Sequence, residues 1–380
     1  MQYDYIIAGG GCSGLSLLLR LIHSGRFADK KILLIDRDEK KSNDRTWCFW
    51  ETTSGFFEHL VYKKWTTLNF FGNDFSTTLN IAPYEYKMIR GIDFYTYAYS
   101  IIKQQRNIDI VFDLIDSIEN KGDHAVLNTK SRAFTASYIF NSSLLRKLNF
   151  EKHYALQQHF KGWFIKTPRP FFTEKSATLM DFRVRQQHGT TFVYLLPFDE
   201  QRALVEYTLF TRDLLQPEEY DRALADYLKE FHQLSDYQIE EKEFGVIPMT
   251  NYPFSPGEGR IINMGTAGGQ TKASSGYTFQ FIQKQAQRLT DDLINTGVPS
   301  TAKSSLQKRF SFYDAVLLNI LDNQKLGGRE VFTDLFKNGD AQTVFKFLDN
   351  ETAVHEDLKI MSRLPKVIFA KAAFEELTHR

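Results

Sequence analysis

The sequence has few cysteines, few prolines and almost no net charge, and each shortage excludes a class of protein. Its 380 residues include two cysteines, Cys12 and Cys48, which are too few for a disulfide framework and lack the spacing of a metal site. With ten prolines and 42% apolar residues, the chain is neither disordered nor collagen-like. A formal charge of +1 argues against a nucleic-acid partner or a polybasic membrane binder. We therefore expect a globular protein of two or three domains in the reducing cytoplasm, without a metal.

Long hydrophobic runs are also lacking, whereas aromatic residues are abundant. The longest stretch without Asp, Glu, Lys or Arg is 5–19, which is interrupted by glycines and is too short to span a bilayer. It does not have the pattern of a signal peptide, because Asp4 precedes it and a basic segment does not. Phe, Tyr and Trp together make up 14% of the chain, which is the most unusual feature of the composition.

The first glycine-rich segment has the pattern of a dinucleotide-binding unit. A strand-like run at 5–8 is followed by a G-x-G-x-x-G motif, a helical run at 15–22 and a second strand-like run at 31–36 that ends in an acid. The first glycine permits a tight turn, the second lets the backbone approach a pyrophosphate, and the third allows helix and strand to pack closely. The diphosphate is expected at the helix N-terminus, with the acid accepting from ribose hydroxyls. The predicted contacts are Gly9, Gly11, Ser13, Gly14, Asp36 and Arg37.

This unit alone leaves FAD and NAD open, and a second glycine-rich segment favours FAD. Flavoproteins with such a fingerprint commonly return late in the chain with a strand, a glycine-containing loop and a long helix aimed at the isoalloxazine. Here a strand at 260–264, the loop 265–269 and a helix over 276–293 fit that pattern, with Ser274 or Ser275 as N-cap. The alternative is two glycine-rich surface loops around an ordinary helix. The predicted contacts are Gly265, Thr266, Gly276 and Tyr277.

The expected fold class is α/β, with a Rossmann-like FAD-binding domain of parallel sheet and helices, an antiparallel β-sheet substrate domain and a helical C-terminal region. The cofactor domain is expected to be discontinuous. The predicted boundaries are 1–45, 85–150 and 257–297 for the FAD-binding domain, 46–84 and 151–256 for the substrate-binding β domain, and 298–380 for the helical cover.

Several elements are predicted inside these domains from residue type and periodicity. A helix is expected over 86–105, and a hairpin is expected from strands 191–198 and 203–210. Further strands are expected at 109–112, 125–127 and 138–140, and short helices at 310–321 and 343–348. Small residues at 141–143 suit close passage of the backbone beside a cofactor.

Glu206 is the leading candidate for acid/base chemistry. In the run 203–210, alternation places it on one face with Leu204, Thr208 and Phe210, and both faces of the strand are largely apolar. A carboxyl that is desolvated in this way has a raised pKa and can transfer protons near neutral pH. The alternatives are an edge strand or an ion pair with a buried Arg.

Several motifs together resemble the bacterial lycopene β-cyclases, a carotenoid cyclase family related to FAD-dependent monooxygenases and geranylgeranyl reductases. The matching segments follow one another in family order and, with the segment 358–367, cover nearly the whole chain. They are the glycine motif with Asp36, Asp44-Arg45-Thr46-Trp47-Cys48-Phe49-Trp50, 89–95, Met180-Asp181, 195–197, Leu204-Val205-Glu206-Tyr207-Thr208, Gly245-Val246-Ile247-Pro248-Met249, 265–269 and 275–277.

The resemblance implies a redox-neutral cyclisation of lycopene to β-carotene, by proton addition, ring closure and proton loss. It implies that Glu206 is the acid/base and that FAD must be reduced, so that negative charge stabilises the carbocation in a dry site. The exact step of Glu206 stays open, because the reduced flavin is the alternative source of the first proton. Two departures are visible, because Thr266 replaces an acid common in the wider superfamily and Ser142-Ser143 replaces its usual glycine-containing pair. The alternatives are a monooxygenase or a prenyl reductase on the same fold, or a non-enzymatic carotenoid or lipid carrier.

Other residues are assigned by position in this resemblance. Arg45 and Arg90 are expected to reach FAD, while surface or ion-pair roles stay open. Asp181 and Glu85 are weaker acid candidates. The predicted tunnel residues are Trp47, Phe49, Trp50, Asp181, Phe198 and Phe210, for each of which core packing is the common alternative.

The expected partners follow from an apolar substrate. They are lycopene or γ-carotene, an external reductant or reductase that delivers NAD(P)H electrons to the flavin, and a membrane surface, with no nucleic acid. We expect peripheral attachment to the cytoplasmic side of the cell membrane through exposed apolar residues of the C-terminal helices.

Overall fold

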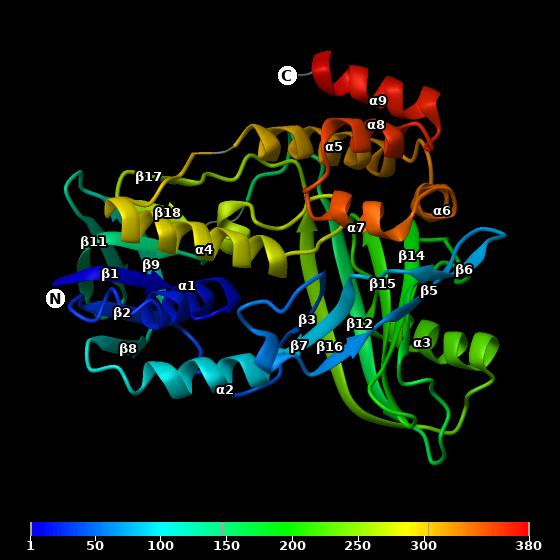
Figure 1. The fold of residues 1–380 in the computed structure, drawn as a ribbon, viewed down its shortest axis with the longest axis horizontal. Helices are drawn as coiled ribbons and strands as arrows, with labels where there is room; N and C mark the ends of the chain where they lie inside the picture. The colour runs from blue at the N-terminus through cyan, green and yellow to red at the C-terminus, as the bar shows by residue number, and fades with distance from the viewer. Residues whose placement is uncertain (1, 146–147, 303, 379–380) are drawn as a thin grey trace.

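The computed structural model describes residues 2–145, 148–302 and 304–378, and it has the predicted α/β architecture. Figure 1 shows one lobe built on a mostly parallel sheet, a second lobe built on a tall antiparallel sheet, and helices from the C-terminal part of the chain above the second lobe. A small sheet lies between the two lobes. These are named the first, second and third sheets, and the third is the small one.

The first sheet has the Rossmann-like order β17-β18-β11-β1-β2-β8, in which β18, β11, β1, β2 and β8 run parallel. Its strands are β1 (Gln2–Ala8), β2 (Ile32–Asp36), β8 (Ile108–Phe112), β9 (Ile115–Asn120), β10 (Ala125–Thr129), β11 (Ala133–Asn141), β17 (Gly257–Glu258) and β18 (Ile261–Asn263). One face is covered by α1 (Cys12–His23), α2 (Gly91–Ile102) and α4 (Phe279–Thr296). The predicted strands and the first helix are confirmed, because apolar residues on both faces of β1 and β2 are buried as in a central parallel sheet.

The second sheet has the order β16-β12-β15-β14-β13-β5-β6 and is antiparallel except between β13 and β5. Its strands are β5 (Thr67–Phe71), β6 (Ser76–Asn80), β12 (Leu156–Lys166), β13 (Ser176–Asp181), β14 (Thr190–Pro197), β15 (Arg202–Thr211) and β16 (Gln238–Met249). The predicted hairpin is confirmed as β14 and β15. One face is covered by α3 (Pro217–His232), a helix that we did not predict within this strand-rich region.

The third sheet corrects the prediction of one long helix over 86–105. Residues Glu85–Arg90 form β7, which pairs with both β3 (Thr46–Glu51) and β4 (Lys63–Trp65), and α2 begins only at Gly91. Pairing on both sides, with four consecutive buried residues in β7, outweighs the local helical pattern. A short 3-10 helix, η1 (Glu58–Leu60), lies between β3 and β4.

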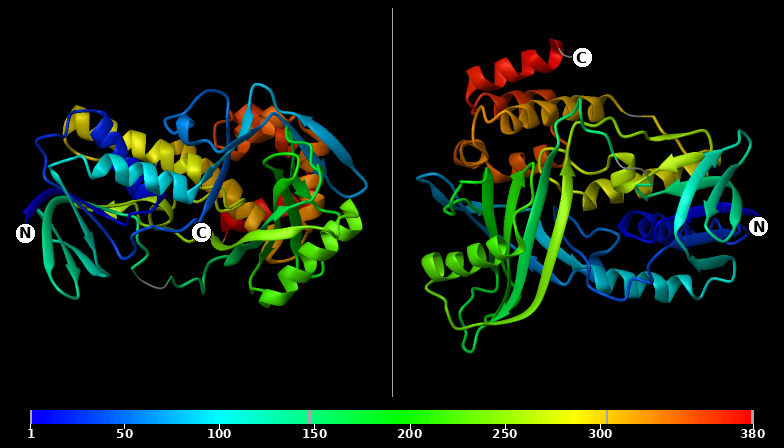
Figure 2. Two further views of the ribbon diagram at one scale, coloured as in Figure 1. Left: turned by 90° about the horizontal axis from the view of Figure 1, so that it is seen from below. Right: turned by 180° about the vertical axis from the view of Figure 1, so that it is seen from behind.

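The helical region consists of α5 (Ser305–Asp322), α6 (Gly328–Asn338), α7 (Ala341–Leu348), α8 (Val354–Met361) and α9 (Lys366–Thr378). α6 and α7 contribute to the same hydrophobic core as the face of the second sheet opposite α3. Figure 2 shows from behind that the long strands β12 and β16 form the edge of the second sheet that faces the first lobe. In the described part of the chain, we find no helix that combines the length and apolarity needed to cross a membrane.

The helix predicted over 276–293 is present but begins later than expected. α4 starts at Phe279 with Thr278 at its N-cap, and neither Ser274 nor Ser275 caps it. Ser274 Oγ instead donates to Asp314 Oδ1 on α5 over 2.6 Å. The segment ahead of α4 therefore connects to the helical region rather than to its own helix.

Candidate active site

The turn between β1 and α1 brings the chain into very close contact with itself. Gly9 has a φ of 109°, which lets the chain leave β1 in a tight turn. A Cβ on Gly14 would lie 2.0 Å from the Gly9 carbonyl oxygen, so that only glycine allows α1 to pack this closely against the turn. Around Gly11, in contrast, a Cβ would meet no atom within 4 Å. The turn thus leaves open space beside the helix N-terminus.

Polar groups at this turn suit the nucleotide half of a dinucleotide. The Gly10 N–H donates to Asp36 Oδ2 over 2.6 Å at the end of β2. Within the described residues, Ser13 Oγ on the first turn of α1 and the Tyr99 hydroxyl on α2 are buried without a hydrogen-bond partner. Such orphaned groups at a helix N-terminus fit a bound phosphate and ribose. Sequence reasoning missed Tyr99, whose hydroxyl would lie 3.0 Å from a Cβ on Gly10.

The loop predicted to return to the cofactor does lie against this turn. A Cβ on Gly265 would be 2.9 Å from Ser13 Cβ, and the Gly265 N–H donates to Gln285 Oε1 on α4 over 3.0 Å. Thr266 Oγ1 faces Thr271 Oγ1 at 3.2 Å. This loop forms a 3-10 turn, η2 (Gly265–Gly268), between β18 and α4. Arg37 is exposed beyond the end of β2.

The two arginines predicted to reach FAD are placed at the third sheet. Arg45 is exposed, and its Nη1 donates to the Asp44 carbonyl over 2.9 Å. Arg90 is the last residue of β7 rather than part of a helix, and it makes a bidentate pair with Asp93 at 2.7 and 2.9 Å. Its guanidinium also lies 4.0 Å from the ring centroid of Tyr62. Arg90 is therefore held by a protein carboxylate.

Glu206 is not alone on its face of the second sheet. Gly162 on β12 is opposite Glu206 on one side and opposite Glu243 of β16 on the other, so the three residues form one row. A Cβ on Gly162 would lie 2.9 Å from Glu243 Cγ and 3.0 Å from Glu243 Oε1. The missing side chain of Gly162 therefore leaves room for the Glu243 side chain in the row that also holds Glu206. We did not predict Glu243, because the charge run 240–243 has the pattern of an exposed edge.

The two carboxyls have few donors to share. Thr208 Oγ1 donates to Glu206 Oε1 over 2.9 Å, and Thr46 Oγ1 donates to Glu243 Oε2 over 2.7 Å. Burial, followed by the negative charge of Glu243, raises the pKa of Glu206 well above its usual range. Burial also raises the pKa of Glu243. The predicted alternation of β15 is confirmed, since Leu204 and Phe210 lie in the core opposite α3.

Aromatic side chains surround this pair. Tyr194 on β14 is directly opposite Glu206, and its hydroxyl lies 3.4 Å from that of Tyr277. Trp50 makes an edge contact with Tyr277 at 4.5 Å between ring centroids and stacks near Tyr86 at 6.4 Å. Cys48 lies two residues from Thr46 on the same face of β3, and burial, then Glu206 and Glu243, raise the pKa of its thiol. The setting is mostly apolar and holds neutral hydroxyl groups.

Only some of the predicted tunnel residues lie on the side of the sheets that carries Glu206 and Glu243. Trp47 and Phe49 point to the opposite face of β3, where both pack near Phe279 of α4, at 6.1 and 4.5 Å. Phe198 stacks on Phe164 at 5.7 Å, and Phe210 contacts Phe332 of α6 at 6.3 Å. Alternation along a strand thus divides the predicted set between two cores.

Asp181 lies away from the pair, on the α3 side of the second sheet. It is fully buried, and its Oδ2 accepts from Arg183 Nη2 over 2.5 Å and from the Tyr227 hydroxyl over 2.9 Å. A carboxylate with this ion pair is explained by structure, which corrects its place among the acid and tunnel candidates.

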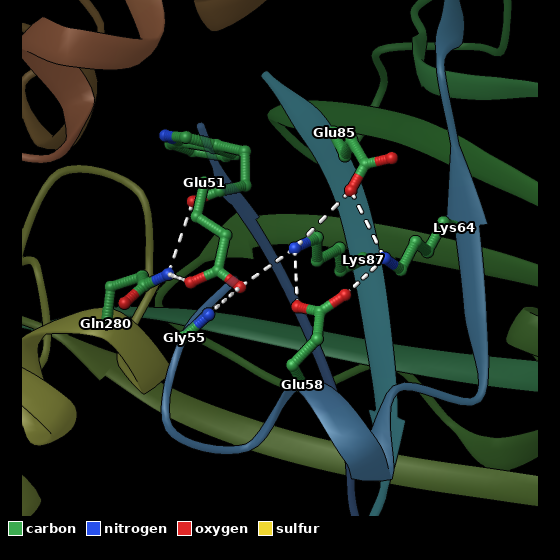
Figure 3. Close-up of polar contacts among 8 residues, drawn as sticks. Glu51, Gly55, Glu58, Lys64, Glu85, Lys87 and Gln280 are labelled. Atoms are coloured by element: carbon green, nitrogen blue, oxygen red, sulfur yellow. Dashed lines mark hydrogen bonds and ion pairs between the residues drawn. The ribbon is translucent and has the colours of Figure 1, made fainter. Parts of the chain in front are cut away.

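Glu85 belongs to a charge cluster around the buried Lys87, shown in Figure 3. Lys87 Nζ lies 3.0 Å from Glu51 Oε1, 2.7 Å from Glu58 Oε2 and 3.4 Å from Glu85 Oε2. Lys64 also pairs with Glu58 and Glu85. Glu85 is thus an ion-pair partner of Lys87 on its own strand and of Lys64 on β4, rather than a free acid.

A cavity of about 1070 Å³ lies outside this region, beside α5, α9 and the loops 250–256 and 268–273. It is lined by neither Glu206 nor the glycines of the first turn. Among the described residues, no group of His, Cys, Asp and Glu is arranged to hold a metal ion.

Fold and site together define a class of protein: a Rossmann-like FAD-binding fold that carries two neighbouring carboxyls, Glu206 and Glu243, on its second sheet. The model of the lycopene cyclase protein family matches residues 4–374, and the chain therefore belongs to the lycopene cyclase family. No curated protein matches the chain significantly.

Solved structures share the fold at low sequence identity. A geranylgeranyl bacteriochlorophyll reductase-like protein from Thermoplasma acidophilum has a TM-score of 0.65 at 11% identity, over 97% of this chain and 98% of that one. A flavoprotein/dehydrogenase from Cytophaga hutchinsonii has a TM-score of 0.67 at 11% identity, over 99% and 100%. A mutant of the halogenase PltM in complex with FAD has a TM-score of 0.60 at 14% identity, over 92% and 79%. These likenesses confirm the fold class.

Proposed function

We propose that the protein is a lycopene β-cyclase, an isomerase that closes β-rings at the ends of lycopene without change of oxidation level. The observation that carries this proposal is Glu206, a carboxyl with a raised pKa beside Glu243 and among the rings of Trp50, Tyr194 and Tyr277. A polyene offers no polar group to bind, so a site for it needs apolar walls and a proton donor. Membership of the lycopene cyclase family supports this substrate class.

The chain's own residues account for the proton steps. Glu206, held protonated by its raised pKa, donates a proton to the terminal double bond and leaves a tertiary carbocation. The neighbouring double bond attacks this cation and closes the six-membered ring. A proton then leaves the ring as the new double bond forms. Because one proton is added and one is lost, the product has the same atoms and oxidation level as lycopene. The aromatic rings exclude water that would otherwise quench the cation, and their faces favour positive charge.

Reduced FAD is the proposed cofactor, and the turn between β1 and α1 fits its nucleotide half. Gly9, Gly11, Ser13 and Asp36 would hold the diphosphate and ribose, with Tyr99 as an added donor. When bound, the reduced flavin would supply negative charge that stabilises a carbocation. We propose an external reductant or an NAD(P)H-dependent reductase as the source of its electrons.

The test is an anaerobic conversion. Purified protein with dithionite-reduced FAD and lycopene under argon is expected to yield products of unchanged mass that contain β-rings, resolved by chromatography and mass spectrometry. Gain of oxygen would indicate a monooxygenase, and gain of hydrogen would indicate a prenyl reductase. Either result would replace the proposal.

A carrier is separated from an enzyme by one pair of variants. Glu206→Gln is expected to retain carotenoid binding and lose product formation, whereas Glu240→Gln, which removes an exposed carboxylate from β16, should retain both binding and product formation. Binding without conversion by the wild-type protein would favour a carrier. The same incubation with γ-carotene compares the two proposed substrates.

We also propose peripheral attachment to the cytoplasmic side of the cell membrane through α8 and α9. On α9, Val367, Phe374 and Leu377 are 82%, 66% and 63% exposed and lie on one side of the helix, while Ala372 on the other side is buried. Leu358 on α8 is 62% exposed. Apolar residues on an outer helix face suit insertion among lipid headgroups.

Liposome flotation tests this attachment. The protein is expected to float with liposomes at high salt, because apolar insertion is not screened by ions. Phe374→Asp should abolish flotation, whereas Val298→Asp, at a 58% exposed site after α4, should not. Release of the wild-type protein by salt alone would contradict insertion.

A further inference from the structure

The row formed by Glu206, Gly162 and Glu243 is built for contact between two carboxyls. Neighbouring strands bring Glu206 and Glu243 to the same glycine from opposite sides. Any side chain at position 162 would separate them, because a Cβ there would lie within 3.0 Å of both Glu243 Cγ and Oε1. A residue choice that removes the only side chain between two acids indicates that their proximity has a use.

Hydrogen-bond accounting shows that one donor is missing at this row. Glu206 Oε1 is satisfied by Thr208, and Glu243 Oε2 is satisfied by Thr46. Glu243 Oε1, in a residue that is 8% exposed, is buried with no donor among the described residues. Ionised carboxylates are acceptors only, so a second carboxyl can satisfy this oxygen only when it carries a proton.

The surroundings do not support two negative charges. The titratable groups around the pair and its neighbours come from several segments, namely Arg45, Cys48, Tyr86, Tyr194, Glu241 and Tyr277. Of these, Arg45 alone is a cation, and its side chain is exposed. Two adjacent carboxyls in such a setting ionise in two separate steps, with one proton retained after the first.

We propose that Glu206 and Glu243 share one proton at neutral pH, and that Glu243 is the positioning residue that keeps Glu206 protonated and oriented for transfer. The role in transfer rests on the proposed cyclase function, whereas the shared proton does not. After donation, the pair would carry two charges, which makes Glu206 a ready acceptor for the proton that leaves the ring. One carboxyl pair thus serves both proton steps.

Infrared spectroscopy of the protein labelled with ¹³C-glutamate tests the shared proton without reference to activity. The wild-type protein at neutral pH is expected to show a protonated carboxyl band that is lost in both Glu206→Gln and Glu243→Gln and kept in Glu240→Gln. In Glu243→Gln the new amide donates to Glu206, which stabilises its anion. Absence of the band in the wild type, or its survival in Glu243→Gln, would overturn the proposal.

Kinetics test the positioning role. In Glu243→Gln we expect kcat to fall about tenfold or more at neutral pH, with KM unchanged, and the alkaline limit of kcat to move to lower pH by about one unit. Activity should recover on acidification and in Glu243→Asp, which restores a carboxyl. A fall in kcat that is equal at every pH would show that Glu243 has only a structural role.

The two proposals fail in different ways. A wild-type protein that shows the band but makes no cyclic product refutes the cyclase and retains the shared proton. A wild-type protein that cyclises lycopene but does not show the band refutes the shared proton. Thermal unfolding shows whether Glu243→Gln folds. If it does not, the proposal is supported when the wild-type band disappears with rising pH and the same band is present in Glu243→Asp. It is overturned when either result is absent.

Discussion

The nucleotide end of the molecule, where we expect FAD to bind, is built mainly from the continuous stretch 9–36, with Tyr99 and Gly265 beside it. The carboxyl pair instead draws its parts from four strands that are far apart in sequence. The glycine turn is held by contacts between near neighbours, such as Gly14 against the Gly9 carbonyl. The pair depends on the register of β12, β15 and β16 and on Thr46 of β3. The first region is thus mainly a local arrangement, proposed here for cofactor binding, and the second is an arrangement made by strand pairing, proposed for proton chemistry. Variants can separate the two.

The largest effect is expected from Glu206→Gln, which removes the proton donor and leaves the nucleotide end intact. Turnover of lycopene should fall about 10²–10⁴-fold, as is usual for loss of a general acid. FAD affinity, followed by flavin fluorescence, should stay unchanged because the turn at 9–14 does not contact Glu206. A parallel loss of FAD would show that the two regions are not independent.

Gly14→Ala should instead disturb the nucleotide end and leave the carboxyl pair intact, since its Cβ would lie 2.0 Å from the Gly9 carbonyl oxygen. Moving α1 away from the turn should cost about 1–3 kcal/mol in the free energy of unfolding, and FAD affinity should fall. Gly11→Ala is the matched control, because a Cβ there meets no protein atom within 4 Å. It should leave the unfolding midpoint unchanged and still weaken FAD binding; a stability loss equal to that of Gly14→Ala would contradict this reading of the open space.

Gly162→Ala tests whether the glycine is present for the pair. The added Cβ would lie 2.8 Å from Leu204 Cδ1 and 2.9 Å from Glu243 Cγ, so Glu243 must shift. We expect kcat to fall about tenfold at neutral pH, with destabilisation of about 1–2 kcal/mol measured by chemical denaturation. If Gly162→Ala keeps the kcat of the wild-type protein at all pH values, the contact between the carboxyls is not needed for turnover.

The smallest effect, and one of opposite sign, is expected from Thr208→Val. Thr208 donates to Glu206 and lowers its pKa by stabilising the anion. Loss of this hydrogen bond, worth about 1 kcal/mol, should raise the pKa of Glu206 by less than about one unit. The alkaline limit of kcat should therefore move to higher pH, opposite to the shift in Glu243→Gln. A downward shift in Thr208→Val would contradict the assigned direction of this bond.

The same contrast explains how much could be predicted from the sequence. The β1-α1-β2 unit, the hairpin of β14 and β15 and the candidate Glu206 follow from spacing and alternation over short windows. Residues 86–90 were predicted as part of a helix and instead belong to a strand, because its two strand partners, β3 and β4, are set by tertiary pairing. Glu243 and Gly162 were not predicted for a related reason. The register between distant strands brings them beside Glu206, and a short window of sequence does not reveal that register. Tyr99 lies on a helix whose pattern indicated only a core face.

The charge cluster around Lys87 marks another limit of sequence reasoning. Glu85 is one of the weaker acid candidates in the sequence, and Lys64 and Lys87 pair with it in the third sheet. Asp181 likewise forms an ion pair with Arg183, which is two residues away in the sequence. Glu206 differs from both because its neighbouring titratable group is a second acid, and for this reason we propose Glu206, and not Glu85 or Asp181, as the proton donor.

The most direct test of the central claim is anaerobic cyclisation of lycopene in D₂O with reduced FAD. If Glu206 delivers a solvent-exchanged proton that stays in the ring while a different hydrogen leaves, each new β-ring should carry one deuterium on carbon, measured by mass spectrometry. Glu206→Gln should abolish this labelled product. Ring formation without deuterium, or a labelled product formed equally by Glu206→Gln, would contradict the account.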